Sequence, residues 1–199
     1  MELAILILYS LALLIVFIYS LSQLQLLLNY LKAKKQVDTA EKFYLNDKTQ
    51  IPNVTIQLPL YNELYVVERL LDNIAEIKYP KDQLEIQVLD DSTDESVALI
   101  TEKVSALKKA GFDIKHIRRE SRTGFKAGAL KEGLKIAKGE FIAIFDSDFL
   151  SKKDWLLQTV PYFKDPEIGV VQTRWAHINR DYSWLTKIQA FAHDFHFIM

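Results

Sequence analysis

The sequence predicts an α/β protein: a doubly wound domain with a mostly parallel sheet, preceded by one transmembrane helix. Three observations predict it. The first 31 residues are almost free of charge, short apolar runs then alternate with helical stripes, and polar clusters follow several of those runs. A strand–helix alternation of this kind requires right-handed crossovers and places helices on both faces of the sheet.

The composition excludes several classes of protein. The chain has 199 residues, 25 Lys+Arg against 26 Asp+Glu, and no cysteine. Without cysteine there is no disulfide framework, thiolate zinc site or cysteine nucleophile. The balanced charge argues against a nucleic-acid partner, which normally requires a basic surplus. A hydrophobic content of 49% is ample for a packed core.

The stretch from Leu3 to Leu31 contains no charged residue and predicts a membrane span over residues 1–31. As a helix it would be about 43 Å long, against a hydrocarbon core of about 30 Å. Lys32, Lys34 and Lys35 follow directly, so the positive-inside tendency places the rest of the chain in the cytosol. A secretory signal peptide is the alternative, but the chain lacks a basic start and a small-x-small cleavage site.

Residues 32–50 are polar and without a clear period, which predicts a linker with a turn at Asn46-Asp47. The remaining residues, 51–199, predict the α/β domain. Four of its apolar runs have the length and content of strands: 54–58, 84–89, 114–117 and 141–145. Three stretches between them carry apolar residues at helical spacing: 66–77, 97–107 and 129–137.

Two of the strands allow a finer prediction. The first should stop at Pro59, because proline cannot donate to a strand ladder. The run 141–145 is apolar without interruption, which is typical of a central strand covered on both faces.

Acidic and polar residues follow three of the predicted strands, in the segments 59–63, 90–94 and 146–148. In doubly wound sheets the ligand lies beyond the carboxyl ends of the strands, so these segments should meet at one edge. The alternative is that each is merely a solvated turn.

Two local patterns suggest what this edge binds. Asp146 and Asp148 are two residues apart, so in extended chain both can reach one point and hold a hard divalent cation together with phosphate oxygens. The segment 122–130 opens a helix with glycines and Lys126, a pattern that favours an anion. It matches neither the dinucleotide-binding nor the P-loop glycine pattern. Glycines placed there only for close packing are the alternative.

Together, these segments resemble a known family. The series Leu58–Glu63, Asp90–Asp94, Gly124–Leu130, Asp146–Asp148 and Gln172–Trp175 is similar to that of the family-2 inverting glycosyltransferases, which have a Rossmann-like, nucleotide-binding GT-A fold. The segment 171–190 points to their membrane-bound cellulose-synthase-like and mannan-synthase-like branch. The resemblance covers about residues 50–199.

The resemblance implies a hexosyltransferase that uses a nucleotide sugar to extend a membrane-associated β-linked polysaccharide. UDP-glucose and GDP-mannose both fit as donors. The implied donor-site residues contact the base, the ribose or the diphosphate: Tyr61, Glu63, Asp90, Asp91, Lys126 and Asp146. Asp146 and Asp148 would bind Mg²⁺ or Mn²⁺, and Gln172, Arg174 and Trp175 would lie on the acceptor side.

The family also has parts that this sequence lacks. Its general base is an acid in a downstream Thr-Glu-Asp-like motif, followed by a Gln-x-x-Arg-Trp motif and further membrane helices. Gln172–Trp175 has one residue between Gln and Arg where that later motif has two. We therefore expect an N-terminal fragment of a multi-pass cell-membrane protein whose base lies beyond residue 199. Its expected partners are the donor, a glycan acceptor and the membrane, with the catalytic domain cytoplasmic.

Two other functions remain open at this point. One is a non-catalytic nucleotide-binding or assembly module with the same fold. The other is a phosphohydrolase of the haloacid-dehalogenase type, whose apolar strand and D-x-D pattern resemble residues 141–148. That family places the pattern after its first strand and has Thr or Val where this chain has Leu150.

Overall fold

The computed structural model describes residues 2–33 and 51–198, and it divides into two compact units. One contains residues 51–171, and the other contains residues 2–33 and 172–198. Most of the predicted linker, including the turn at Asn46-Asp47, lies outside the described residues; Lys32 and Ala33 belong to the first helix.

The predicted N-terminal helix is present as α1 (Glu2–Ala33). It is long and apolar enough to cross a membrane by length and composition, and none of its most apolar window is buried in protein. Apolar side chains surround it on all sides, so it has no polar face of the kind a surface helix would turn to water. The hydroxyls of Ser20 and Ser22 bond back to the carbonyls of Val16 and Ile18, which satisfies them without water.

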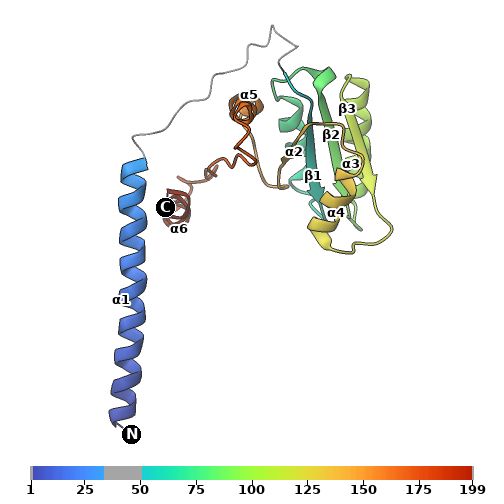
Figure 1. The fold of residues 1–199 in the computed structure, drawn as a ribbon. Coiled ribbons are helices and arrows are strands. Elements are labelled where there is room, and N and C mark those ends of the chain that lie inside the picture. The colour runs from blue at the N-terminus through green and yellow to red at the C-terminus, as the bar shows by residue number, and fades with distance from the viewer. Residues whose placement is uncertain (1, 34–50, 199) are drawn as a thin grey trace. The chain divides into compact units, whose positions relative to one another are not determined.

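The unit of residues 51–171 contains a parallel sheet of four strands in the order β3-β2-β1-β4. Its elements follow the predicted alternation: β1 (Val54–Leu60), α2 (Val67–Ala75), the short η3 (Lys81–Gln83), β2 (Leu84–Asp90), α3 (Ser96–Lys109), β3 (Asp113–Arg118), α4 (Phe125–Leu134) and β4 (Phe141–Ile144). Figure 1 shows this unit with its helices beside the sheet. The doubly wound α/β fold is confirmed.

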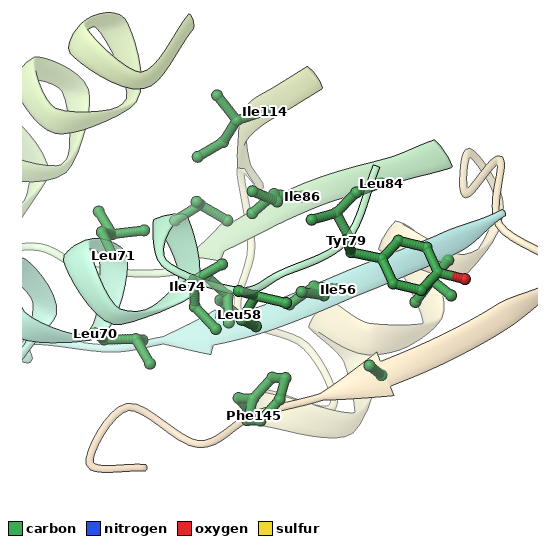
Figure 2. Packing of buried hydrophobic residues seen from close by; sticks show 14 of the residues in the cluster. Ile56, Leu58, Leu70, Leu71, Ile74, Tyr79, Leu84, Ile86, Ile114 and Phe145 are labelled. Atoms are coloured by element: carbon green, nitrogen blue, oxygen red, sulfur yellow. The ribbon is translucent and has the colours of Figure 1, made fainter. Parts of the chain in front are cut away.

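One face of the sheet carries the hydrophobic core. Ile56 of β1 and Ile86 of β2 lie on the side of α2, and together with Leu70 and Ile74 of that helix they belong to one cluster of buried side chains (Figure 2). The core extends to α3 through Ile100. Because strand residues two apart share a face, the even-numbered positions of β1 and β2 build this side.

The other face is covered by α4 and is buried but polar. Gln57 donates to the side chain of Gln87 over 3.0 Å, and Thr55 donates to Glu85 over 2.7 Å. Burial raises the pKa of Glu85, but bonds from Lys115, the Lys138 amide and Thr55 outweigh it and hold that pKa below its ordinary value. These pairs satisfy groups that would otherwise be costly to bury, with the exception of the side-chain nitrogen of Gln87, which has no partner among the described residues.

The expectation that the first strand stops at Pro59 was wrong. β1 continues to Leu60, and Pro59 pairs in register with Leu89. The carbonyl of Gln57 faces β4, where it accepts from Phe145 N, so the nitrogen of Pro59 two residues later faces the same side. There β4 has already ended at Ile144, and the missing donor costs nothing.

The expectation that residues 141–145 form a central strand was also wrong. β4 pairs only with β1 and is an edge strand of the described sheet, with Ile144 48% exposed. An apolar run does not reveal how many neighbours a strand has. The chain continues into α5 (Trp155–Thr159) and η4 (Val160–Lys164) and forms no further strand in the described part after residue 148.

The other unit contains α6 (Trp184–Ile198) besides α1. A reciprocal cap explains where α6 begins. The Ser183 amide donates to the Thr186 hydroxyl over 2.9 Å, and the Thr186 amide donates to the Ser183 hydroxyl over 3.1 Å. Serine at the N-cap thereby satisfies one of the free amides of the first turn.

Candidate functional site

A cavity of about 390 Å³ lies at the carboxyl ends of β1 and β4. In the strand order β3-β2-β1-β4 the chain first builds outward from β1 and then returns to its other side, so β1 and β4 form the topological switch point at which such sheets bind ligands. The cavity is lined by Pro59, Leu60, Tyr61, Glu63, Asp91, Arg122, Lys126, Ala129, Asp146, Ser147 and Asp148. The structure thus brings together all the donor-site residues named from the sequence except Asp90.

The segment after β1 supplies Tyr61 and Glu63. Between them Asn62 has a φ of +56°, a left-handed conformation that asparagine tolerates better than most residues. Its amide donates to the Ser92 hydroxyl over 3.0 Å, and its side-chain oxygen accepts from the Thr93 amide over 2.9 Å. These two bonds fasten the loop after β1 to the loop after β2.

The segment after β2 supplies only one of its two aspartates. Asp91 lines the cavity, and Arg119 donates to both oxygens of its carboxylate, Nε over 2.9 Å and Nη2 over 2.5 Å. Asp90 is fully buried and is paired with His116 Nε2 at 2.8 Å. Burial raises the pKa of Asp90, but the bonds from His116 and Ser92 outweigh it and leave that pKa below its ordinary value.

The segment after β4 supplies Asp146 and Asp148, and α4 faces them with Lys126, whose ammonium forms an ion pair with Asp146. Residues 2–33 and 51–198 contain no group of three or more His, Cys, Asp or Glu side chains that could hold a metal ion. Two carboxylates at the wall of an open cavity nevertheless fit Mg²⁺ or Mn²⁺, because such ions are commonly held by one or two carboxylates with phosphates and water.

Two arginines of this region were missed by the sequence reasoning. Arg122 lines the cavity with its guanidinium 3.3 Å from the ring centre of Tyr61, and Arg119 holds Asp91 from behind. The turn that places Arg122 is unusual, since Gly124 has φ +74° and Phe125 has φ +48°. A left-handed non-glycine residue is strained and persists only where its surroundings fix it.

The residues expected on the acceptor side lie in the unit that contains α6. Gln172, Arg174 and Trp175 are in the irregular segment before that helix. Arg174 forms an ion pair with Asp194 and thereby lowers the pKa of that carboxyl, and the ring of Trp175 lies 6.0 Å from the ring of His193.

Comparison with known proteins gives a consistent result. A probable glucomannan 4-beta-mannosyltransferase 7 of Oryza sativa subsp. japonica is 43% identical over 153 residues, which are 74% of this chain and 26% of that protein. Glucomannan 4-beta-mannosyltransferase 9 of Arabidopsis thaliana is 40% identical over 151 residues, 73% of this chain and 28% of that protein. The chain thus spans about a quarter of the length of these relatives.

A solved structure of the mannosyltransferase PcManGT from Pyrobaculum calidifontis, in complex with GDP-Man and Mn²⁺, matches with a TM-score of 0.62 and 32% identity over 82% of this chain and 46% of that one. The phosphohydrolase alternative finds no support, because D-x-D follows β4 and not the first strand. The sequence model described as glycosyl transferase family 2 matches residues 55–198. This chain belongs to glycosyl transferase family 2.

Proposed function

We propose that this chain forms the donor-binding part of a membrane-anchored enzyme that transfers mannose from GDP-mannose, with Mg²⁺ or Mn²⁺, to a growing β-1,4-linked glycan. The observation that carries the proposal is a cavity lined by two carboxylates, Asp146 and Asp148, and by Lys126, whose ammonium pairs with Asp146. The names of the plant relatives and the GDP-Man and Mn²⁺ in the archaeal structure favour GDP-mannose over UDP-glucose.

Each side of the cavity suits one part of such a donor. Tyr61, Glu63 and Asp91 would meet the base and ribose, because they combine an aromatic ring with hydrogen-bond acceptors. Lys126, in the first turn of α4, would contact the diphosphate, where helix amides and an ammonium both favour an anion. Asp90, whose carboxylate is bonded to His116 and Ser92, would support Asp91 and not contact the ligand.

The transfer breaks the bond between the anomeric carbon of mannose and the diphosphate, while an acceptor hydroxyl attacks that carbon and loses its proton. Negative charge grows on the leaving diphosphate, and the ammonium of Lys126, which lines the cavity, would stabilise it. A cation held by Asp146 and Asp148 would neutralise the same charge as a Lewis acid. The proton requires a general base within hydrogen-bond reach of the acceptor, and we propose that a segment after residue 199 provides it.

The remaining assignments complete the proposal. α1 would anchor the enzyme in the cell membrane, with the domain of residues 51–199 on the cytoplasmic side, because Lys32 and further lysines follow the apolar stretch. Gln172, Arg174 and Trp175 would contribute to the acceptor side. The full-length protein would cross the membrane several times.

Isothermal titration of the 199-residue chain in detergent micelles tests the donor site. GDP and UDP are titrated with Mn²⁺ into the wild type and into the double variant Asp146→Ala, Asp148→Ala. We expect GDP to bind the wild type more tightly than UDP, and we expect the double variant to lose the part of this affinity that depends on Mn²⁺.

The matched control is the double variant Glu102→Ala, Glu167→Ala, which removes the same charge at two exposed positions away from the cavity. It should bind as the wild type does. Tighter binding of UDP would replace GDP-mannose by a UDP-sugar as donor. Unchanged Mn²⁺-dependent binding in the Asp146→Ala, Asp148→Ala variant would refute the metal site.

A further inference from the structure

Arg119 lies outside the cavity lining but joins two of its walls. Its side chain is only 12% exposed, and the carboxylate of Asp91 that it holds is 7% exposed. Two parallel bonds from one guanidinium to one carboxylate fix both the position and the plane of that carboxylate. The bond with Asp91 also raises the pKa of Arg119, so the guanidinium keeps its positive charge.

The same guanidinium also holds the turn that leads into α4. Nη1 donates to the Thr123 carbonyl over 2.9 Å, and Nη2 donates to the Phe125 carbonyl over 3.1 Å. Phe125 is the non-glycine residue of this turn with a left-handed φ, so Arg119 bonds directly to the strained position. Arg122 is the first residue of this turn, whose Phe125 amide donates to the Arg122 carbonyl, and Lys126 follows Phe125 immediately, so the turn sets where both cavity side chains start.

Gly128 shows how closely this arrangement is packed. A Cβ at Gly128 would lie 2.7 Å from Nη1 of Arg119 and 2.0 Å from the Thr123 carbonyl oxygen. Real Cβ atoms do not approach backbone atoms so closely, so only glycine at position 128 lets α4 lie against the Thr123 carbonyl. Gly128 is therefore explained by this carbonyl, to which Arg119 also donates.

We propose that Arg119 is a positioning residue that couples Asp91, at the base end of the cavity, to Lys126, at the diphosphate end, by fastening the turn of residues 122–125. This inference rests on the proposed function. A single guanidinium can do this because it has enough donors in a fixed plane for one carboxylate and two carbonyls, whereas the ammonium of lysine cannot reproduce the parallel pair.

The test combines hydrogen exchange with nucleotide titration on the full chain in detergent micelles. Exchange is followed in a peptide that covers the amides of Phe125 and Gly128, which bond to Arg122 and Gly124. In Arg119→Met, Arg119→Lys and Asp91→Asn we expect this peptide to exchange faster while a peptide of α2 is unchanged. GDP with Mn²⁺ should bind each variant at least about tenfold more weakly, a factor that corresponds to ~1.4 kcal/mol.

Arg69→Met is the matched control, since Arg69 is an exposed arginine of α2 outside the cavity lining. It should change neither measurement. Unchanged exchange in Arg119→Met would overturn the coupling. Full GDP affinity in Arg119→Lys, or weakened affinity without faster exchange, would show that Arg119 acts through charge or direct contact and would also overturn it. A wild type that binds neither GDP nor UDP would refute the proposed function, and exchange alone would then decide whether Arg119 fastens the turn.

Discussion

Replacing Lys126 by methionine should change two affinities in opposite directions. In the structure the Lys126 ammonium is paired with the Asp146 carboxylate, which is one of the two proposed cation ligands. The same ammonium lies at the wall where the diphosphate is expected. Lys126→Met therefore frees a carboxylate for the cation and removes a positive charge from the anion. Methionine keeps most of the length of the side chain and none of its charge.

The exposure of the pair sets the magnitude of the first effect. The side chains of Lys126 and Asp146 are 52% and 35% exposed, so solvent screens their attraction. Exposed pairs of this kind contribute ~0.2–1 kcal/mol, and losing one should raise Mn²⁺ affinity by at most roughly fivefold. A hydrogen bond to a charged group is worth ~1.5–3 kcal/mol, so GDP affinity at saturating Mn²⁺ should fall by roughly 10- to 150-fold.

Calorimetric titration of MnCl₂ alone, followed by GDP at saturating Mn²⁺, separates the two effects. Lys131→Met is the control, because Lys131 is exposed on the same helix and does not line the cavity. It should leave both affinities unchanged. A Lys126→Met chain that binds Mn²⁺ more weakly than the wild type would refute the reasoning, because it would mean that Lys126 helps to shape the cation site and does not compete for it.

Three further changes test the fold that supports the site. Gly139→Ala should lower the free energy of unfolding by about 2 kcal/mol in urea titrations, because its Cβ would lie 2.3 Å from the backbone nitrogen of Thr55; an unchanged midpoint would contradict this. Leu70→Ala should cost about 3 kcal/mol in the same assay, since Leu70 is fully buried in the core. The pKa of Asp90 is lowered, so its ionised form stabilises the fold above about pH 4 and this contribution is lost as the pH falls through its folded-state pKa. Asp90→Asn should therefore flatten the acid-side decline of the melting temperature, and an identical decline would refute the role of the His116 pair.

The strands and helices could be predicted because their signals are local. Alternating apolar residues in 54–58 and the helical stripe in 66–77 appear in any short window of the sequence. The number of neighbours of β4 is not local, because it depends on whether a later segment joins the sheet. The continuation of β1 through Pro59 also depends on where β4 ends on the neighbouring side.

The alternation of residues in β2 could have predicted that Asp91 lines the cavity and that Asp90 does not. In β2 the even positions Ile86 and Val88 are apolar, whereas Glu85 and Gln87 are polar. Asp90 continues the even series and so falls on the core side, where its carboxylate pairs with His116 Nε2. Arg119 and Arg122 had no such signal, because their contacts depend on the left-handed turn at residues 124–125. The positive φ of Phe125 could not be predicted, since a phenylalanine rarely adopts that conformation.

The cavity is held together by attractions between segments that are distant in the sequence. Arg119 pairs with Asp91, Lys126 with Asp146, and the guanidinium of Arg122 lies over Tyr61. In the first pair Arg119 lies outside the cavity lining and has four of its five N–H donors bonded, whereas both partners of each of the other two contacts line the cavity. A ligand that brings an aromatic base, two phosphates and a cation would replace the contact of Lys126 with Asp146 and that of Arg122 with Tyr61 by contacts of its own. The pair of Arg119 and Asp91 would persist on binding and keep the two walls of the cavity in place.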